Sequence, residues 1–168
     1  MKLNFQKPLH QLLNGRLLGH PIHPMLVHFP TALFSSSLLF DLAGLWLSKP
    51  TLYAASFYCI GTGLAGGTLA AAFGLVDYVR LKNRQKLFQK ASLHALLQFS
   101  VLILFAVVFG LRYERTSELA APEITEIAVS GLGVLAMIVG NYLGGDLVFR
   151  YGVGVNADPS DRNGRPEG

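Results

Sequence analysis

The 168-residue chain has few charges and almost no cysteine. Only 14% of its residues are charged, against about a quarter in soluble domains, and 51% are hydrophobic. Its one cysteine, Cys59, lies in an apolar run, so no disulfide can form within the chain. The sequence has no phosphate-binding glycine loop, nucleophile elbow or HExxH motif. These absences argue against a soluble domain and a disulfide scaffold, and we favour a non-enzymatic role.

The chain does have four long apolar stretches. A helix rises 1.5 Å per residue, so about 20 apolar residues cross the roughly 30 Å of hydrocarbon in a bilayer. The predicted spans are Met25–Leu47, Leu52–Val79, Ala91–Leu111 and Ile124–Phe149. Because the linkers are short, neighbouring helices should run antiparallel. The sequence therefore predicts an all-α integral membrane four-helix bundle with up-down-up-down topology, embedded in a lipid bilayer.

The basic residues predict the orientation of this bundle. Eleven of the 14 Lys and Arg residues lie in the N-terminal segment, the middle loop and the tail, which puts these parts in the cytoplasm. We therefore expect a multi-pass protein of the bacterial cytoplasmic (inner) membrane with both termini inside. This topology also explains the net charge of +4, so we expect no nucleic-acid partner.

Three regions follow from this reading. Residues 1–24 should form a cytoplasmic interfacial segment, because apolar residues recur there at roughly helical spacing among Lys7, Gln11 and Arg16. Residues 25–149 form the transmembrane domain. Residues 150–168 are rich in Gly, Asn and Asp and should form a flexible cytoplasmic tail.

Small residues predict where the helices pack closely. One line along the second span consists of Gly63, Gly67, Ala70, Gly74 and Asp77. A similar line along the fourth span consists of Gly133, Met137, Gly140 and Gly144. Asp77 should face the bundle interior at the cytoplasmic end. We expect Asp146 to form an interfacial ion pair with Arg150, four residues later.

Histidines gather at the entry to the first span, where residues 19–30 read GHPIHPMLVHFP. Histidine titrates near neutral pH and is the commonest metal ligand. His20, His23 and His28 precede or open the first span. Asp77 closes the second span and His94 opens the third, all at the cytoplasmic level. The segment before the first span, the start of the first span, the end of the second and the start of the third thus bring ionisable side chains to one level of the bundle.

Two cofactor hypotheses follow from this convergence. A b-type haem would take axial imidazoles from His28 and His94, which lie at similar depth on the first and third spans. A transition-metal ion would draw its ligands from His20, His23, Asp77 and His94. His20 and His23 each precede a proline, which favours extended backbone and holds them about 9 Å apart. They cannot share one ion unless the chain turns between them.

Two hypotheses without a cofactor remain open. The chain could be a structural or assembly subunit that contacts a membrane-protein partner or a second copy, with its histidines in local hydrogen bonds. It could also be a small proton or ion transporter that uses Asp41, deep in the first span. The intervals from His28 to Asp77 and from His94 to Asp146 are similar, which hints at a duplicated helical hairpin.

The motifs also resemble a known family. GHPIHPMLVHFP, then FDLAG, GLVDY and finally NYLGGDLVFRYGVGV are similar to the bacterial predicted membrane proteins of domain-of-unknown-function family 2231. The resemblance covers about residues 16–155. It implies a four-helix inner-membrane protein and no assigned activity. Some relatives are linked to redox and metal-associated modules, and the position of His28 is not always histidine, which shifts weight to His20, His23 and His94.

Overall fold

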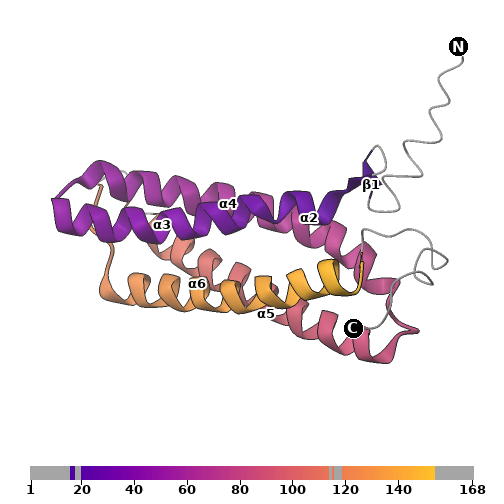
Figure 1. The fold of residues 1–168 in the computed structure, drawn as a ribbon. Helices are drawn as coiled ribbons and strands as arrows, with labels where there is room; N and C mark the ends of the chain where they lie inside the picture. The colour runs from indigo at the N-terminus through magenta and orange to yellow at the C-terminus, as the bar shows by residue number, and fades with distance from the viewer. Residues whose placement is uncertain (1–15, 18–19, 114, 116–118, 154–168) are drawn as a thin grey trace, which may run out of the picture.

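A computed structural model of the chain describes residues 16–17, 20–113, 115 and 119–153. Its four long helices are α3 (His28–Leu47), α4 (Pro50–Val79), α5 (Gln85–Tyr113) and α6 (Ile124–Gly145) (Figure 1). A short helix, α2 (Ile22–Leu26), leads into α3, and α6 continues into the π-helical turn η2 (Asp146–Arg150). Four helical segments are long and apolar enough to cross a membrane. The predicted all-α four-helix fold is therefore confirmed.

Local sequence explains where the helices begin and end. Val27 separates α2 from α3, because Pro30 has no N–H to donate to the preceding turn. Ser48 adopts the left-handed conformation and ends α3. Pro50 is the first residue of α4, where a backbone N–H would have no partner within the helix. Glu123 and Glu126 form a capping box at the start of α6.

Two very short strands precede the first span. β1 (Arg16–Leu17) and β2 (His20–Pro21) pair antiparallel. His20 lies in extended backbone, as predicted. The same prediction for His23 was wrong, because His23 lies in the helix α2. The predicted amphipathic segment falls mainly on residues 1–15, outside the described residues. Most of the predicted tail, residues 154–168, also lies outside them.

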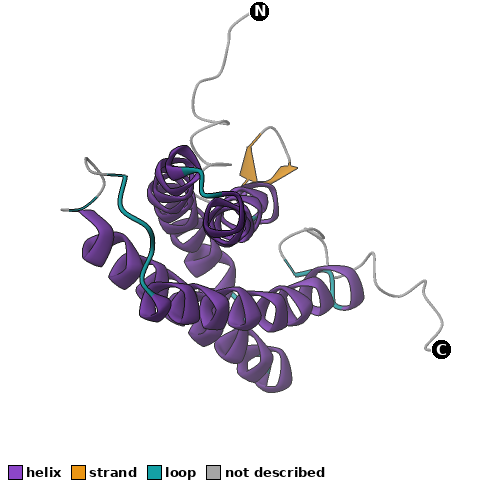
Figure 2. Cartoon of the chain, turned by 90° about the vertical axis from the view of Figure 1, so that its left-hand side faces the viewer, coloured by secondary structure: helices purple, strands orange, loops and turns teal. Residues whose placement is uncertain are grey.

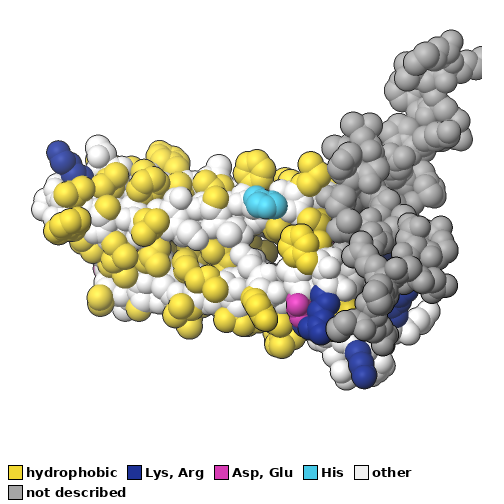
Figure 3. Space-filling model, viewed as in Figure 1, with side chains coloured by type: hydrophobic (Ala, Val, Ile, Leu, Met, Phe, Trp, Pro, Cys, Tyr) yellow, Lys and Arg dark blue, Asp and Glu magenta, His cyan; other side chains and the backbone are white. Residues whose placement is uncertain are grey.

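Hydrophobic side chains cover much of the face of the bundle that Figure 3 shows, and the Lys and Arg side chains seen on this face lie near its two ends. Trp46 is 86% exposed, and Ile124 is 78% exposed. A protein with such an apolar surface would be insoluble in water, whereas the same surface is favourable against the hydrocarbon chains of a lipid bilayer.

The helices pack as two antiparallel hairpins that lie side by side (Figures 1 and 2). α3 packs mainly on α4 and α5 mainly on α6, and the hairpins meet along α4–α5 and α3–α6. The predicted small-residue grooves are present: a Cβ on Gly63 would lie 2.6 Å from the Phe34 ring, and one on Gly133 would lie 2.8 Å from the Phe105 ring. In lipid, such close approach provides the van der Waals contact that holds helices together.

The two hairpins carry equivalent contacts. Phe34 and Phe105 lie 71 positions apart (34 to 105), and the glycines they pack against, Gly63 and Gly133, lie 70 positions apart (63 to 133). The bundle therefore has an approximate two-fold relation between its halves, in agreement with the predicted duplication. The alignment of the two halves differs from the predicted one. The predicted repeat matched His28 with His94, whereas the observed offset matches His23 with His94.

Candidate functional site: paired histidines on the bundle axis

His23 is positioned by the short helix α2. Its Nδ1 lies 2.7 Å from the carbonyl oxygen of Ala70 in α4. Because a carbonyl can only accept a hydrogen bond, Nδ1 must carry the proton and donate it. The ring also fits against Gly74, where a Cβ would lie 2.8 Å from Cε1. A carbonyl and a glycine of one helix thus fix both the tautomer and the position of this imidazole.

His94 repeats this arrangement in the second hairpin. Its Nδ1 lies 2.8 Å from the carbonyl oxygen of Gly140 in α6, so it too donates from Nδ1. A Cβ on Gly144 would lie 2.7 Å from Cε1 of His94. The same two contacts therefore hold both imidazoles, from equivalent positions in the two halves.

The two imidazoles meet on the axis of the bundle. Their ring centroids are 6.3 Å apart, and the ring planes are inclined by 78°. Neither Nε2 takes part in a hydrogen bond among the described residues. With Nδ1 protonated, Nε2 carries the lone pair that binds a metal. The arrangement brings two such imidazoles together from different hairpins.

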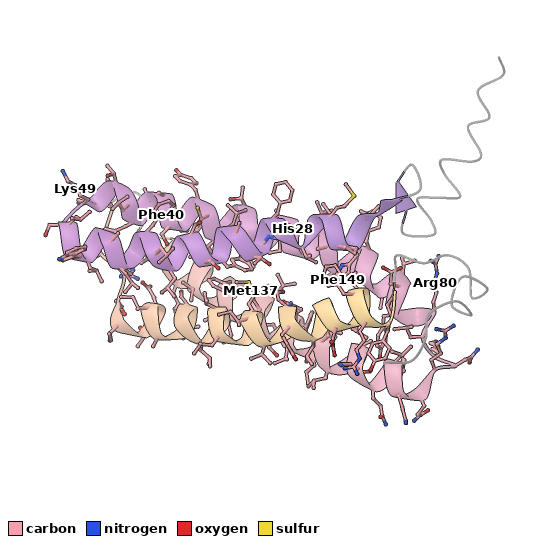
Figure 4. The ribbon with its side chains drawn as sticks, in the orientation of Figure 1. His28, Phe40, Lys49, Arg80, Met137 and Phe149 are labelled. Carbon is pink, nitrogen blue, oxygen red and sulfur yellow. The ribbon has the colours of Figure 1, made fainter. Side chains whose placement is uncertain are left out.

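The other predicted site residues lie elsewhere. His28 is exposed, and its Nδ1 lies 3.3 Å from the carbonyl oxygen of Met25 (Figure 4). Asp77 is largely buried and forms a long ion pair, 4.0 Å, with Arg80. The side chain of His20 is outside the described part of the chain. Of the predicted residues, the structure brings together His23 and His94. Within the described ranges, no group of three or more His, Cys, Asp and Glu side chains could hold a metal ion.

A polar chain lies one helical turn from His94. Gln98 donates from Nε2 to Asn141 Oδ1 at 2.7 Å, and Asn141 donates from Nδ2 to Thr31 Oγ1 at 3.1 Å. These bonds link α5, α6 and α3. Their equivalents in the other half, Val27, Ala71 and Leu102, cannot form such side-chain bonds. The two imidazoles therefore have matching contacts of their own but different surroundings.

Beyond this chain, an apolar layer closes the axis. The rings of Phe34 and Phe105 are fully buried and stack with centroids 4.0 Å apart and planes only 4° apart. Ile60, Val101, Val108 and Met137 complete this core.

At the far end of the axis lies a buried ion pair that the sequence did not reveal. Arg112 donates to Asp41 Oδ2 at 2.8 Å, to Ser56 Oγ at 3.1 Å and to the carbonyl oxygen of Tyr53 at 3.0 Å. Both charged side chains are almost fully buried. Two other hydroxyls in α3 and α4 bond within their own helices: Ser37 donates to the carbonyl oxygen of Phe34, and Thr62 donates to that of Tyr58.

A second buried carboxylate lies nearby. Glu126 is 1% exposed and pairs with Arg115, which also pairs with Glu123 at 3.2 Å. The predicted spans leave Arg112 and Arg115 in the loop after Leu111 and place Glu126 near the start of the fourth span. One signal for the Asp41–Arg112 pair is present in the sequence. Arg112 follows Asp41 by 71 positions, the same separation as that between His23 and His94.

Comparison with known proteins agrees with this architecture. The family described as "Predicted membrane protein (DUF2231)" matches residues 19–157. The chain belongs to this family. No curated protein and no solved structure matches it. In this DUF2231 protein, the matched range contains both axial pairs, His23 with His94 and Asp41 with Arg112.

Proposed function

We propose that this DUF2231 protein is a membrane haem protein in which His23 and His94 would hold one haem iron. The observation that carries the proposal is the meeting of two imidazoles from different hairpins, with ring centroids 6.3 Å apart and no hydrogen bond to either Nε2 among the described residues. When Nδ1 donates to a carbonyl, Nε2 is the nitrogen that is left to bind a metal.

The donor set favours haem over a bare structural ion. A structural zinc site needs four protein ligands, whereas haem iron takes four nitrogens from the porphyrin and needs only two from the protein. His23 and His94 provide two, from facing helices of different hairpins. Each donates its Nδ1–H to a backbone carbonyl, which is the usual outer contact of a metal-binding histidine. Bound haem would supply one-electron redox chemistry.

We further propose that the histidine pair lies toward the cytoplasmic side of the bacterial inner membrane, with both chain termini inside. The distribution of Lys and Arg in the sequence supports this orientation. A fluorescent reporter that folds only in the cytoplasm, fused to the C-terminus, tests it. Fluorescence is the expected result, and a dark but expressed fusion would reverse the orientation.

An absorbance spectrum of the detergent-purified protein tests the haem proposal. The protein is expressed with a haem precursor, and spectra are taken before and after dithionite, together with iron and copper analysis. We expect a Soret band that shifts on reduction, with one haem per chain. His23→Ala and His94→Ala should each remove it. His28→Ala is the matched control and should keep it, because His28 is exposed and hydrogen-bonded to its own turn.

Other outcomes separate the alternatives. Bound copper or iron without a Soret band, lost in His23→Ala and His94→Ala, would replace haem by a bare metal ion at the same site. Loss of haem in His28→Ala with retention in His23→Ala would restore the pair predicted from sequence. A colourless, metal-free protein from haem-supplied cells would overturn the proposal and leave the structural or assembly role.

A further inference from the structure

A shallow, open depression on the outer surface of α6 and η2 has no role in the haem proposal. It is lined by Tyr142, Gly145, Asp146, Phe149 and Arg150, and we call it the η2 groove. A Cβ on Gly145 would meet nothing nearer than the Phe149 ring at 3.9 Å. The π-helical turn η2 winds more loosely than the α-helix before it.

The chemistry of the groove changes along its length. Phe149, labelled in Figure 4, is 87% exposed. Tyr142 is 74% exposed, so two aromatic rings present apolar surface to the surroundings. Arg150, in the last turn of η2, adds a positive charge at the end of the membrane span. Aromatic and basic residues are typical of the boundary between hydrocarbon and headgroups.

Next to the groove, two cations share one aromatic ring. Lys90 Nζ lies 5.3 Å from the centroid of the Tyr151 ring, and the Arg150 guanidinium carbon lies 5.9 Å from it. Lys90 also forms an ion pair with Asp146. Among the described residues, two positive charges therefore meet one carboxylate here, an excess of one positive charge.

We propose that the η2 groove binds one anionic phospholipid, with its phosphate beside Arg150 and an acyl chain against Tyr142 and Phe149. The excess positive charge complements an anionic headgroup, and the aromatic surface complements the chain next to it. A soluble anion would gain nothing from the aromatic part of the groove. A zwitterionic lipid would gain little from the charge. This inference does not depend on bound haem.

Native mass spectrometry of the full-length protein, incubated in detergent with equimolar phosphatidylglycerol and phosphatidylcholine, tests the inference. We expect wild-type protein to retain phosphatidylglycerol several-fold more than phosphatidylcholine. Arg150→Gln should remove the preference. Lys82→Gln is its charge-matched control, because Lys82 is exposed on the α4–α5 loop at the same end, and it should keep the preference.

A second pair of variants tests the shape of the groove. Gly145→Leu should fill the groove and reduce retention of both lipids. Gly131→Leu is the matched control, because a side chain there also meets open space on α6 but lies outside the groove. Equal retention of the two lipids by wild-type protein would overturn the inference. So would equal losses in Arg150→Gln and Lys82→Gln, which would mean diffuse attraction to the basic end.

Discussion

His23 and His94 occupy equivalent positions at one end of the bundle axis, and Asp41 and Arg112 occupy equivalent positions at the other. At the histidine end the two halves contribute the same side chain, and each ring has a nitrogen without a hydrogen bond among the described residues. At the ion-pair end they contribute opposite charges, and Arg112 bonds to three partners.

This difference separates a binding role from a structural one. Two imidazoles with centroids 6.3 Å apart and planes inclined by 78° make an edge-to-face contact that is favourable by itself, and each still has a nitrogen without a hydrogen bond among the described residues. A buried ion pair gains its energy from its own partners and loses much of it when one is removed. We therefore propose ligand binding for the histidine end and a structural role for the ion-pair end.

The largest effect should come from breaking the ion pair. Arg112→Met leaves the Asp41 carboxylate buried without its cation, and should destabilise the bundle by about 3–5 kcal/mol. Unfolding in mixed detergent micelles, followed by circular dichroism, measures this cost. The double substitution Asp41→Leu with Arg112→Met should recover most of it. If Arg112→Met unfolds like wild-type protein, the ion-pair end has no structural role.

The next largest effect should come from crowding the histidines. Gly144→Ala puts a Cβ 2.7 Å from His94 Cε1, so the ring must move, which should cost about 1–3 kcal/mol and lower haem content. Gly74→Ala should act alike on His23. The neighbouring Gly145→Ala is the control, because its Cβ would meet only the Phe149 ring, at an ordinary contact distance of 3.9 Å. Equal haem content in Gly144→Ala and Gly145→Ala would mean that glycine at 144 does not position the ligand.

A smaller effect should come from the apolar layer between the two ends. Phe105→Leu removes one ring of the buried stack and should cost about 1 kcal/mol, and Phe34→Leu should cost about the same, because the two rings have equivalent environments. The two costs should not add in the double variant, since either change removes the stack. Unequal single costs would show that the two-fold relation does not extend to energetics.

The smallest effect should come from the surface pair beside η2. Lys90 and Asp146 are both partly exposed, so Asp146→Asn should change the free energy of unfolding only slightly. The same unfolding assay, at low and high salt, measures the change and its screening. A cost as large as that of Arg112→Met would mean that both ends of the bundle are held by ion pairs.

Much of the fold could be predicted because it depends on local patterns. Apolar length marked the spans, and the lines through Gly63 and Gly133 marked the faces that pack. Partners could not be predicted in the same way. Asp146 pairs with Lys90 in another helix and not with Arg150, which is four residues away in sequence. Span boundaries based on hydropathy alone also treated Arg112 as a loop residue, although it is buried.

The sequence by itself determined four membrane-crossing helices, their order and the grooves along which they pack, since hydropathy and glycine spacing act within each helix. Only the tertiary structure decided which side chains meet on the axis, because that depends on the register between hairpins. A shift of five residues separates His28, exposed on the outside, from His23, which faces His94. The same register brings Asp41 to Arg112, 71 residues away, and makes a buried pair from two charges that would each be costly alone.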